Sequence, residues 1–112
     1  MKNYCLMMVI LAVCGALLTG CAQSAPKRYG MVIQVRPEKL EEYKRLHAAV
    51  WPDVLKMIHE CNIRNYSIYH KDGYLFSYFE YYGKDFKVDM AKMAADPTTQ
   101  EWWKVCEPCQ LP

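Results

Sequence analysis

The stretch NIRNYSIYHKDGYLFSYFEYYG, residues 62–83, decides the fold of this 112-residue chain. It contains two tyrosine-rich runs that meet at Asp72 and Gly73. An Asp-Gly pair between runs of alternating hydrophobic residues is a strong signal for a tight β-hairpin. The stretch therefore predicts two antiparallel strands, and alternation places Arg64, Tyr66 and Ile68 on one face of the first strand.

The segments before this hairpin predict a strand followed by two helices. The run RYGMVIQVR alternates and is rich in β-branched residues, which favours a strand over residues 29–36. Pro37 suits the first position of a helix, and we expect that helix to reach about Val50. Pro52 can begin a second helix, which is expected to end near Glu60.

After the hairpin the pattern is again helical. Phe86, Met90, Met93 and Ala94 fall at helical spacing, and a methionine-rich stripe of this kind is expected in a core rather than on a binding surface. Asp96 and Pro97 suit the cap and the first residue of a further helix, which carries the run QEWWKV.

The order strand, helix, strand, strand, helix predicts an α+β domain with a ferredoxin-like (βαββαβ) fold of the dimeric α/β-barrel type. This fold requires one more strand, and no strand pattern is found before Pro112. The final strand is therefore expected to be missing, which leaves the domain C-terminally incomplete and one sheet position open. A domain of roughly 90 residues has a small core, so we expect it to form a homodimer.

The segment MKNYCLMMVILAVCGALLTGC, which begins the chain, has the features of an export signal. Lys2 precedes an apolar run that is short for a membrane span, and small residues come before Cys21. The ending LTGC resembles the lipobox of bacterial lipoproteins. We therefore expect a signal peptide over residues 1–20, a lipidated tether over 21–28 that starts at Cys21, and a folded domain over 29–112. The protein would be an exported lipoprotein, anchored to a membrane by lipid.

Charge and cysteine content exclude several classes of function. Without Lys2 the chain has 13 basic (14 minus 1) and 12 acidic residues, and this balance argues against a nucleic-acid surface. Three of the six cysteines, Cys61, Cys106 and Cys109, fall in the expected domain. The run CEPC follows a predicted helix and has no second cysteine pair or histidine partner, so it favours neither a redox centre nor a metal site. An incidental disulfide and two free thiols both remain open.

The first predicted helix carries an unusual apolar stripe. Leu40, Tyr43, Leu46, His47 and Val50 share one side on a 3.6-residue period, and charged residues take the other side. Tyr43 and His47 are four residues apart and are therefore neighbours that face inward. Two interpretations remain open: an ordinary buried pair in the core, or two residues of a functional site.

Two adjacent tryptophans favour the second interpretation. Trp102 and Trp103 point about 100° apart on a helix, so they cannot both enter the same core and at least one is expected to line a cleft. Together with Tyr43, His47 and Tyr66 they would form a pocket suited to a sugar. Aromatic rings cover the C–H faces of a sugar, and hydroxyl, imidazole and indole N–H groups bind its oxygen atoms.

The segments MVIQVRPEKLEEYKRLHAAVWPDV, NYSIY and EWWKV occur in this order between Tyr29 and Val105. Together they resemble the L-rhamnose mutarotase family, whose members interconvert the α and β anomers of a 6-deoxy sugar. The resemblance implies a ferredoxin-like domain that pairs into a dimer and needs no metal, nucleotide or redox cofactor. This chain departs from the family in its lipobox and in the expected loss of the final strand.

The resemblance also implies a role for each site residue. His47, in EYKRLH, matches the proton donor of the family, and the residues that match its sugar contacts are Tyr43, Tyr66, Trp102 and Trp103. An imidazole suits the reaction because its ordinary pKa of about 6.5 makes both protonation states accessible near neutral pH.

Two other functions remain open from the sequence. One is a non-catalytic sugar-binding surface lipoprotein with the same pocket. The other is a small cofactor-independent monooxygenase of the same fold, which the combination of the five site residues disfavours. The sequence leaves open which 6-deoxy sugar is bound.

Overall fold

The computed structural model describes residue 20 and residues 24–112. The predicted signal peptide, apart from Gly20, and the predicted lipidation site Cys21 fall on residues 1–19 and 21–23, which lie outside the described residues. Among the residues that are described, no helix is both long enough and apolar enough to cross a membrane.

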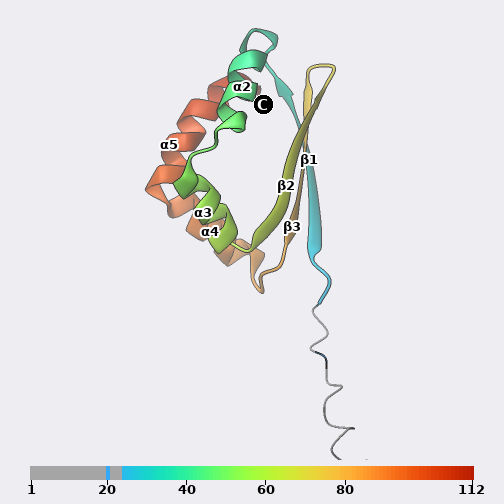
Figure 1. Cartoon of the computed structure of the whole chain (residues 1–112), viewed down its shortest axis with the longest axis vertical. Helices are drawn as coiled ribbons and strands as arrows, with labels where there is room; N and C mark the ends of the chain where they lie inside the picture. Colours follow the sequence, from blue (N-terminus) through green and yellow to red (C-terminus); the bar gives the residue numbers. More distant parts are fainter. Residues whose placement is uncertain (1–19, 21–23) are drawn as a thin grey trace, which may run out of the picture.

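Within the described residues, four strands form one antiparallel sheet in the order β2-β3-β1-β4 (Figure 1). The strands are β1 (Lys27–Val35), β2 (Ile63–Lys71), β3 (Tyr74–Tyr81) and β4 (Gln110–Leu111). The predicted ferredoxin-like α+β fold is confirmed by this sheet and by the helices that cover one of its faces. β1 begins at Lys27, two residues before the expected start of the domain.

The predicted hairpin joins β2 and β3 at the expected place. Asp72 and Gly73 have φ angles of 51° and 81°. Two successive residues with positive φ match the right-handed twist of a hairpin, and this is why Asp-Gly is favoured there. The carbonyl of Gly73 also accepts a hydrogen bond of 3.0 Å from the backbone N–H of Val35, which ties the turn to the end of β1.

The prediction of a missing final strand is wrong, because β4 pairs with the C-terminal end of β1. The backbone N–H of Arg36 donates a 2.8 Å hydrogen bond to the carbonyl of Cys109, which holds the chain beside β1 just before β4. A two-residue strand between prolines is too short to produce an alternating pattern in the sequence. The rest of this edge of β1, residues 27–33, has no strand partner in the described part of the chain.

The α-helices of the described region lie on one face of the sheet (Figure 1). They are α2 (Leu40–Ala48), α3 (Pro52–Glu60), α4 (Phe86–Ala95) and α5 (Pro97–Cys106), and short 3-10 turns at Pro37–Lys39 and Glu107–Cys109 precede α2 and follow α5. The predicted cap of α5 is confirmed, since the Asp96 side chain accepts a 2.8 Å hydrogen bond from the N–H of Thr99. α2 ends earlier than expected, at Ala48, and α3 begins at the predicted Pro52.

The core lies between these helices and the sheet, in three buried clusters. The first contains Val35, Tyr43, Leu75 and Cys109, the second Val54, Trp102 and Cys106, and the third Ile63, Phe79 and Tyr81. Two of the predicted site residues are therefore also core residues. This double role fixes their positions before any ligand binds.

The opposite face of the sheet carries exposed apolar side chains. Val32, Phe76 and Tyr69 are paired in register across β1, β3 and β2. Val32 is 60% exposed and Tyr69 is 66% exposed. Among the described residues, no helix covers this face (Figure 1).

Candidate functional site

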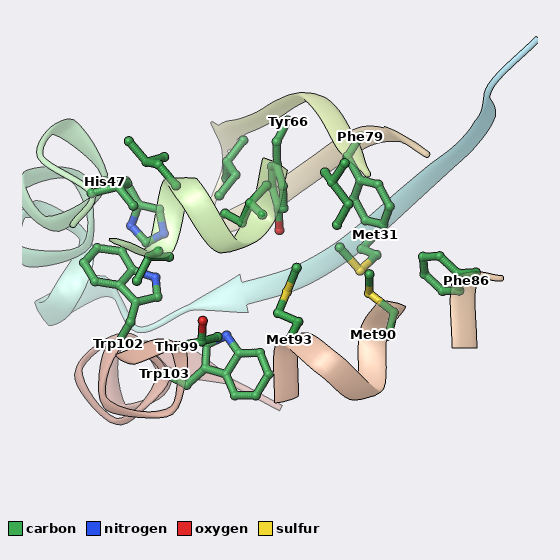
Figure 2. Close-up of a pocket in the computed structure, with 16 residues that line it drawn as sticks. Met31, His47, Tyr66, Phe79, Phe86, Met90, Met93, Thr99, Trp102 and Trp103 are labelled. Carbon is green, nitrogen blue, oxygen red and sulfur yellow. The ribbon is translucent and has the colours of Figure 1, made fainter. Parts of the chain in front are cut away.

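A cavity of about 490 Å³ lies between the helices and the inner face of the sheet (Figure 2). This volume falls within the range of small-molecule sites. His47, Trp102 and Trp103 lie at one end, which we call the histidine end. Phe86 and Met90 lie at the other, which we call the methionine end.

His47 is held on α2 by two contacts with Tyr43. The two rings are stacked with centroids 4.0 Å apart, and Nδ1 of His47 lies 3.0 Å from the backbone carbonyl oxygen of Tyr43. A carbonyl can only accept, so Nδ1 carries the proton of the neutral ring and Nε2 keeps a free lone pair. Burial lowers the pKa of His47, and the hydrogen bond to Tyr43 opposes this shift. His47 is therefore mainly neutral at pH 7, with Nε2 as its basic nitrogen.

Tyr43 stacks against the ring of His47 and does not line the 490 Å³ cavity. Its side chain is buried in the first core cluster. It lines a smaller cavity of about 240 Å³, which it shares with His47. Burial raises the pKa of Tyr43 to about 12, and a hydrogen bond with the Gln110 side chain on β4 acts in the opposite direction. Tyr43 is thus a neutral phenol whose ring positions the imidazole.

The two tryptophans reach the same cavity from adjacent positions on α5. Trp102 is 6% exposed and packs edge-on against His47, at a centroid distance of 5.4 Å, and against Trp51, at 5.3 Å. Trp103 is 37% exposed. The sequence predicted that at least one would line a cleft, and both line this cavity. Trp102 also belongs to the core, whereas Trp103 is the accessible member of the pair.

Tyr66 reaches the cavity because of an irregularity in β2. The pairing of β2 with β3 shifts register between Arg64 and Ser67, and Asn65 there has a φ of 52°. Ile63, Tyr66 and Ile68 consequently line the cavity. Arg64 instead pairs in register with Glu80 and does not share the face of Tyr66, so the expectation from simple alternation is wrong for Arg64.

The hydroxyl of Tyr66 points into the cavity (Figure 2). Burial raises the pKa of Tyr66, although part of its ring is exposed, and a hydrogen bond with Ser77 opposes the shift. The Thr99 hydroxyl also lines the cavity, and it donates a 2.8 Å hydrogen bond to Asp96. Tyr66 is therefore a neutral group that can donate or accept a hydrogen bond at the middle of the site.

The methionine end was not predicted as part of the site. Met31, Phe79, Phe86, Met90 and Met93 line it. The expectation that the methionine stripe packs in the core is correct, because Phe86, Met90 and Met93 all pack against the third cluster. The same three side chains also line the cavity, which was not expected. The sequence signal that could have located this end is the same 86, 90, 93 spacing, which places three large apolar side chains on one face of α4.

A polar network fixes α4 against the sheet and so positions this end. The Asp89 carboxylate accepts hydrogen bonds from Tyr81 Oη, at 2.5 Å, and from Asn62 Nδ2, at 2.9 Å. These bonds lower the pKa of Asp89, so it is ionised at neutral pH. A Cβ at Gly83 would overlap Tyr81 Oη, so only glycine fits there beside the network.

The three cysteines of the described residues do not line the cavity. Cys61, Cys106 and Cys109 are free and buried. Burial raises the pKa of Cys106 to about 12, which leaves it a protonated and unreactive thiol. The CEPC run was interpreted as either a disulfide or two free thiols, and in the structure Cys106 and Cys109 are free thiols. Among the described residues, no cluster of three or more His, Cys, Asp or Glu side chains could hold a metal ion.

The sequence of this chain matches a known family over almost all of the described residues. The family model described as L-rhamnose mutarotase matches residues 28–112. The L-rhamnose mutarotase of Oceanobacillus iheyensis is 32% identical over 84 residues, which cover 73% of this chain and 78% of that protein.

Solved structures agree on the fold. The crystal structure of an L-rhamnose mutarotase from Formosa agariphila matches with a TM-score of 0.63 at 17% identity, covering 75% of this chain and 79% of that one. The tetracenomycin F2 cyclase of Streptomyces glaucescens, a polyketide cyclase, matches with a TM-score of 0.59 at 17% identity, covering 77% and 78%. These two similarities concern the fold alone. On the family match and the sequence identity, the chain belongs to the L-rhamnose mutarotase family.

Proposed function

We propose that this protein is an isomerase that interconverts the α and β anomers of L-rhamnose or a related 6-deoxy sugar. The observation that carries the proposal is the state of His47. Nδ1 of His47 donates a hydrogen bond to the backbone carbonyl of Tyr43, so Nε2 has no proton in the neutral ring. The lowered pKa keeps the ring neutral, and Nε2 can therefore accept a proton inside a cavity lined by aromatic rings.

Ring opening needs one proton removed and one delivered. Nε2 of neutral His47 accepts the proton of the anomeric hydroxyl, while the bond between C1 and the ring oxygen breaks and the C1 carbonyl forms. The imidazolium then gives this proton to the ring oxygen, so the open aldehyde is neutral and His47 is restored. Both oxygens are bonded to C1, so one nitrogen can reach each of them in turn. Rotation about the bond between C1 and C2 before closure yields the other anomer.

The surrounding residues fit this role. Trp103 and Trp102 offer flat faces for the C–H side of the sugar and indole N–H groups for its oxygens. Tyr66 offers a neutral hydroxyl from the opposite wall. Tyr43 stacks on the imidazole of His47 and can hold it in place. The direct sugar contact that the family resemblance implies for Tyr43 stays a prediction. Positioned proton transfer of this kind typically contributes roughly 10² to 10⁴ in rate.

Neither alternative gains support from the family match. The matched family and the Oceanobacillus iheyensis relative are mutarotases, and neither is a monooxygenase or a non-catalytic binding protein.

The direct test is exchange between the two anomers of L-rhamnose, followed by saturation-transfer NMR with the full chain at neutral pH. We expect exchange well above the rate in buffer alone. Exchange with L-fucose but not L-rhamnose would keep the reaction and change the sugar. Binding of the sugar without added exchange would support the sugar-binding alternative.

We also propose that the protein forms a homodimer through the outer face of its sheet. This face presents Val32, Phe76 and Tyr69 in one row. Pairing with a second copy would bury them, and a small domain gains stability in this way. Phe76→Glu should therefore convert a dimer into a monomer in light scattering, while Val88→Glu on the exposed side of α4 should not. A stable, monodisperse monomer in the unmodified protein would contradict the proposal.

Finally, we propose that Cys21 is lipidated and holds the protein on a membrane after export. The support is the LTGC run after an apolar segment that follows Lys2. Cys21→Ala should move the protein to the soluble fraction or leave it at its unprocessed mass. Fractionation that is unchanged in this variant, with no lipid mass on the parent protein, would refute the anchor.

A further inference from the structure

The cavity is larger than a single 6-deoxy sugar requires. It measures about 490 Å³. Eleven water molecules, one for each non-hydrogen atom of a 6-deoxyhexose, would occupy roughly 330 Å³ of liquid. Covalent bonds hold the atoms of a sugar closer together than separate water molecules, so the sugar needs less space than this. Roughly a third of the cavity or more is left beside a bound monosaccharide.

The chemistry of the lining decides where the space remains. The lining side chains with polar atoms, which are His47, Tyr66, Thr99 and the two tryptophans, occupy the histidine end and the middle (Figure 2). At the methionine end the labelled side chains are methionine and phenylalanine. The sugar oxygens belong with the polar groups, so the unfilled space lies among Met31, Phe79, Phe86, Met90 and Met93.

The reaction fixes how the sugar is oriented. Nε2 of His47 must reach the anomeric hydroxyl and the ring oxygen, so these two atoms lie at the histidine end. In a six-membered ring C4 lies opposite C1, and C3 lies opposite the ring oxygen. The substituents on C3 and C4 therefore point toward the methionine end. The methyl group of the 6-deoxy sugar is carried by C5, which is bonded to the ring oxygen, so it cannot fill that space.

A free hydroxyl is poorly suited to this position. Removing a hydroxyl from water without a new hydrogen bond carries a free-energy cost, and methionine and phenylalanine offer no strong partner. A methyl ether or an ester at the same carbon removes the donor and adds apolar surface. Methionine side chains adapt to groups of different shape, which suits a site for such substituents.

We propose that the methionine end is a binding site for an apolar substituent on C3 or C4 of the sugar, so that the preferred substrates are 6-deoxyhexoses carrying an O-methyl or O-acyl group there. This inference rests on the proposed function, because the orientation of the sugar follows from proton transfer by His47. Anomer exchange in such substrates remains possible because the anomeric hydroxyl is free.

The test compares anomer exchange of L-rhamnose with that of its 3-O-methyl and 4-O-methyl ethers, using the full chain and saturation-transfer NMR. At least one of these ethers should show a kcat/KM about fourfold or more above that of L-rhamnose, the gain expected for burying one methyl group. The 2-O-methyl ether is the matched control. Its methyl group lies next to C1, so it should gain nothing.

Two methionine variants locate the effect. Met93→Gln places an amide among the cavity-lining side chains and should bring the ratio of the kcat/KM of the ether to that of L-rhamnose close to one, whatever the absolute rates. Met57→Gln is the control, because Met57 is also half-buried on a helix but lies outside the cavity, beside Cys61. The ratio should be unchanged in this variant.

The outcomes separate this inference from the proposed function. No exchange with any of these four sugars or with L-fucose would remove the proposed function itself. If L-rhamnose exchanges and both ethers exchange at an equal or slower rate, the proposed binding site at the methionine end is overturned. The proposed mutarotase activity would stand. A preference for an ether that persists in Met93→Gln would also overturn this binding site, since the preference would then arise elsewhere.

Discussion

The histidine end and the methionine end of the cavity differ in the chemistry of the side chains that line them. At the histidine end, α2 and α5 bring together an imidazole and two indoles, and the imidazole can change its protonation state. At the methionine end, β1, β3 and α4 contribute side chains that supply only shape and apolar surface. Substitutions at the first end should therefore change the rate of reaction, and those at the second should change which sugar is preferred.

The largest effect that distinguishes the ends is expected from His47→Ala. Exchange of L-rhamnose anomers should fall by roughly 10² to 10⁴, because proton transfer is lost while little apolar surface is removed. NMR exchange rates beside thermal unfolding curves measure both consequences. His59→Ala, on an exposed position of α3, is the control and should change neither. An unfolding temperature that drops while exchange continues at the parent rate would instead make His47 a plain core residue.

The two tryptophans should separate stability from binding within the histidine end. Trp102→Ala removes a core residue and should destabilise the protein by about 3–5 kcal/mol. Trp103→Ala removes the accessible ring and should weaken sugar binding roughly 2- to 10-fold, in line with one lost hydrogen bond, with a small effect on unfolding. Denaturant unfolding and sugar titration on both variants check this. Equal losses of stability in the two variants would mean that Trp103 is also structural.

A smaller effect is expected from pH. Because burial lowers the pKa of His47, kcat/KM should fall on acidification with a midpoint below the ordinary value of about 6.5. The unfolded chain binds this proton more readily than the folded one, so His47 should also reduce folding stability as the pH falls below about 6.5. His47→Gln should remove that part of the pH dependence. A midpoint for kcat/KM above 6.5 would contradict the buried, neutral imidazole.

Most of the fold could be predicted from the sequence because its signals are local. Asp72 and Gly73 specify the hairpin through their own backbone angles, and Asp96 caps α5 through a side chain three residues from its partner. Two features of the sheet could not be predicted, and each has a physical reason. β4 is too short for a periodic pattern, and the bulge at Asn65 moves Arg64 off the face that Tyr66 and Ile68 share.

The candidate site was predicted in part. His47, Tyr66, Trp102 and Trp103 do line one cavity, and Tyr43 is beside His47 as the four-residue spacing required. The spacing could not tell that Tyr43 lies underneath the imidazole, since both residues occupy the same helical stripe. The position of Tyr43 depends on packing against Val35 and Leu75, which come from two strands far apart in the sequence.

The sequence by itself determined which helices and strands form and which chemical groups they carry. Preferences for helix, strand and turn, and contacts between residues i and i+4, act over only a few residues. Only the tertiary structure decided which of these groups share a cavity, which nitrogen of His47 is free, and that the stripe of Phe86, Met90 and Met93 forms a wall of the site. These properties depend on how α2, α4 and α5 pack on the sheet, and packing brings together residues that no local pattern connects.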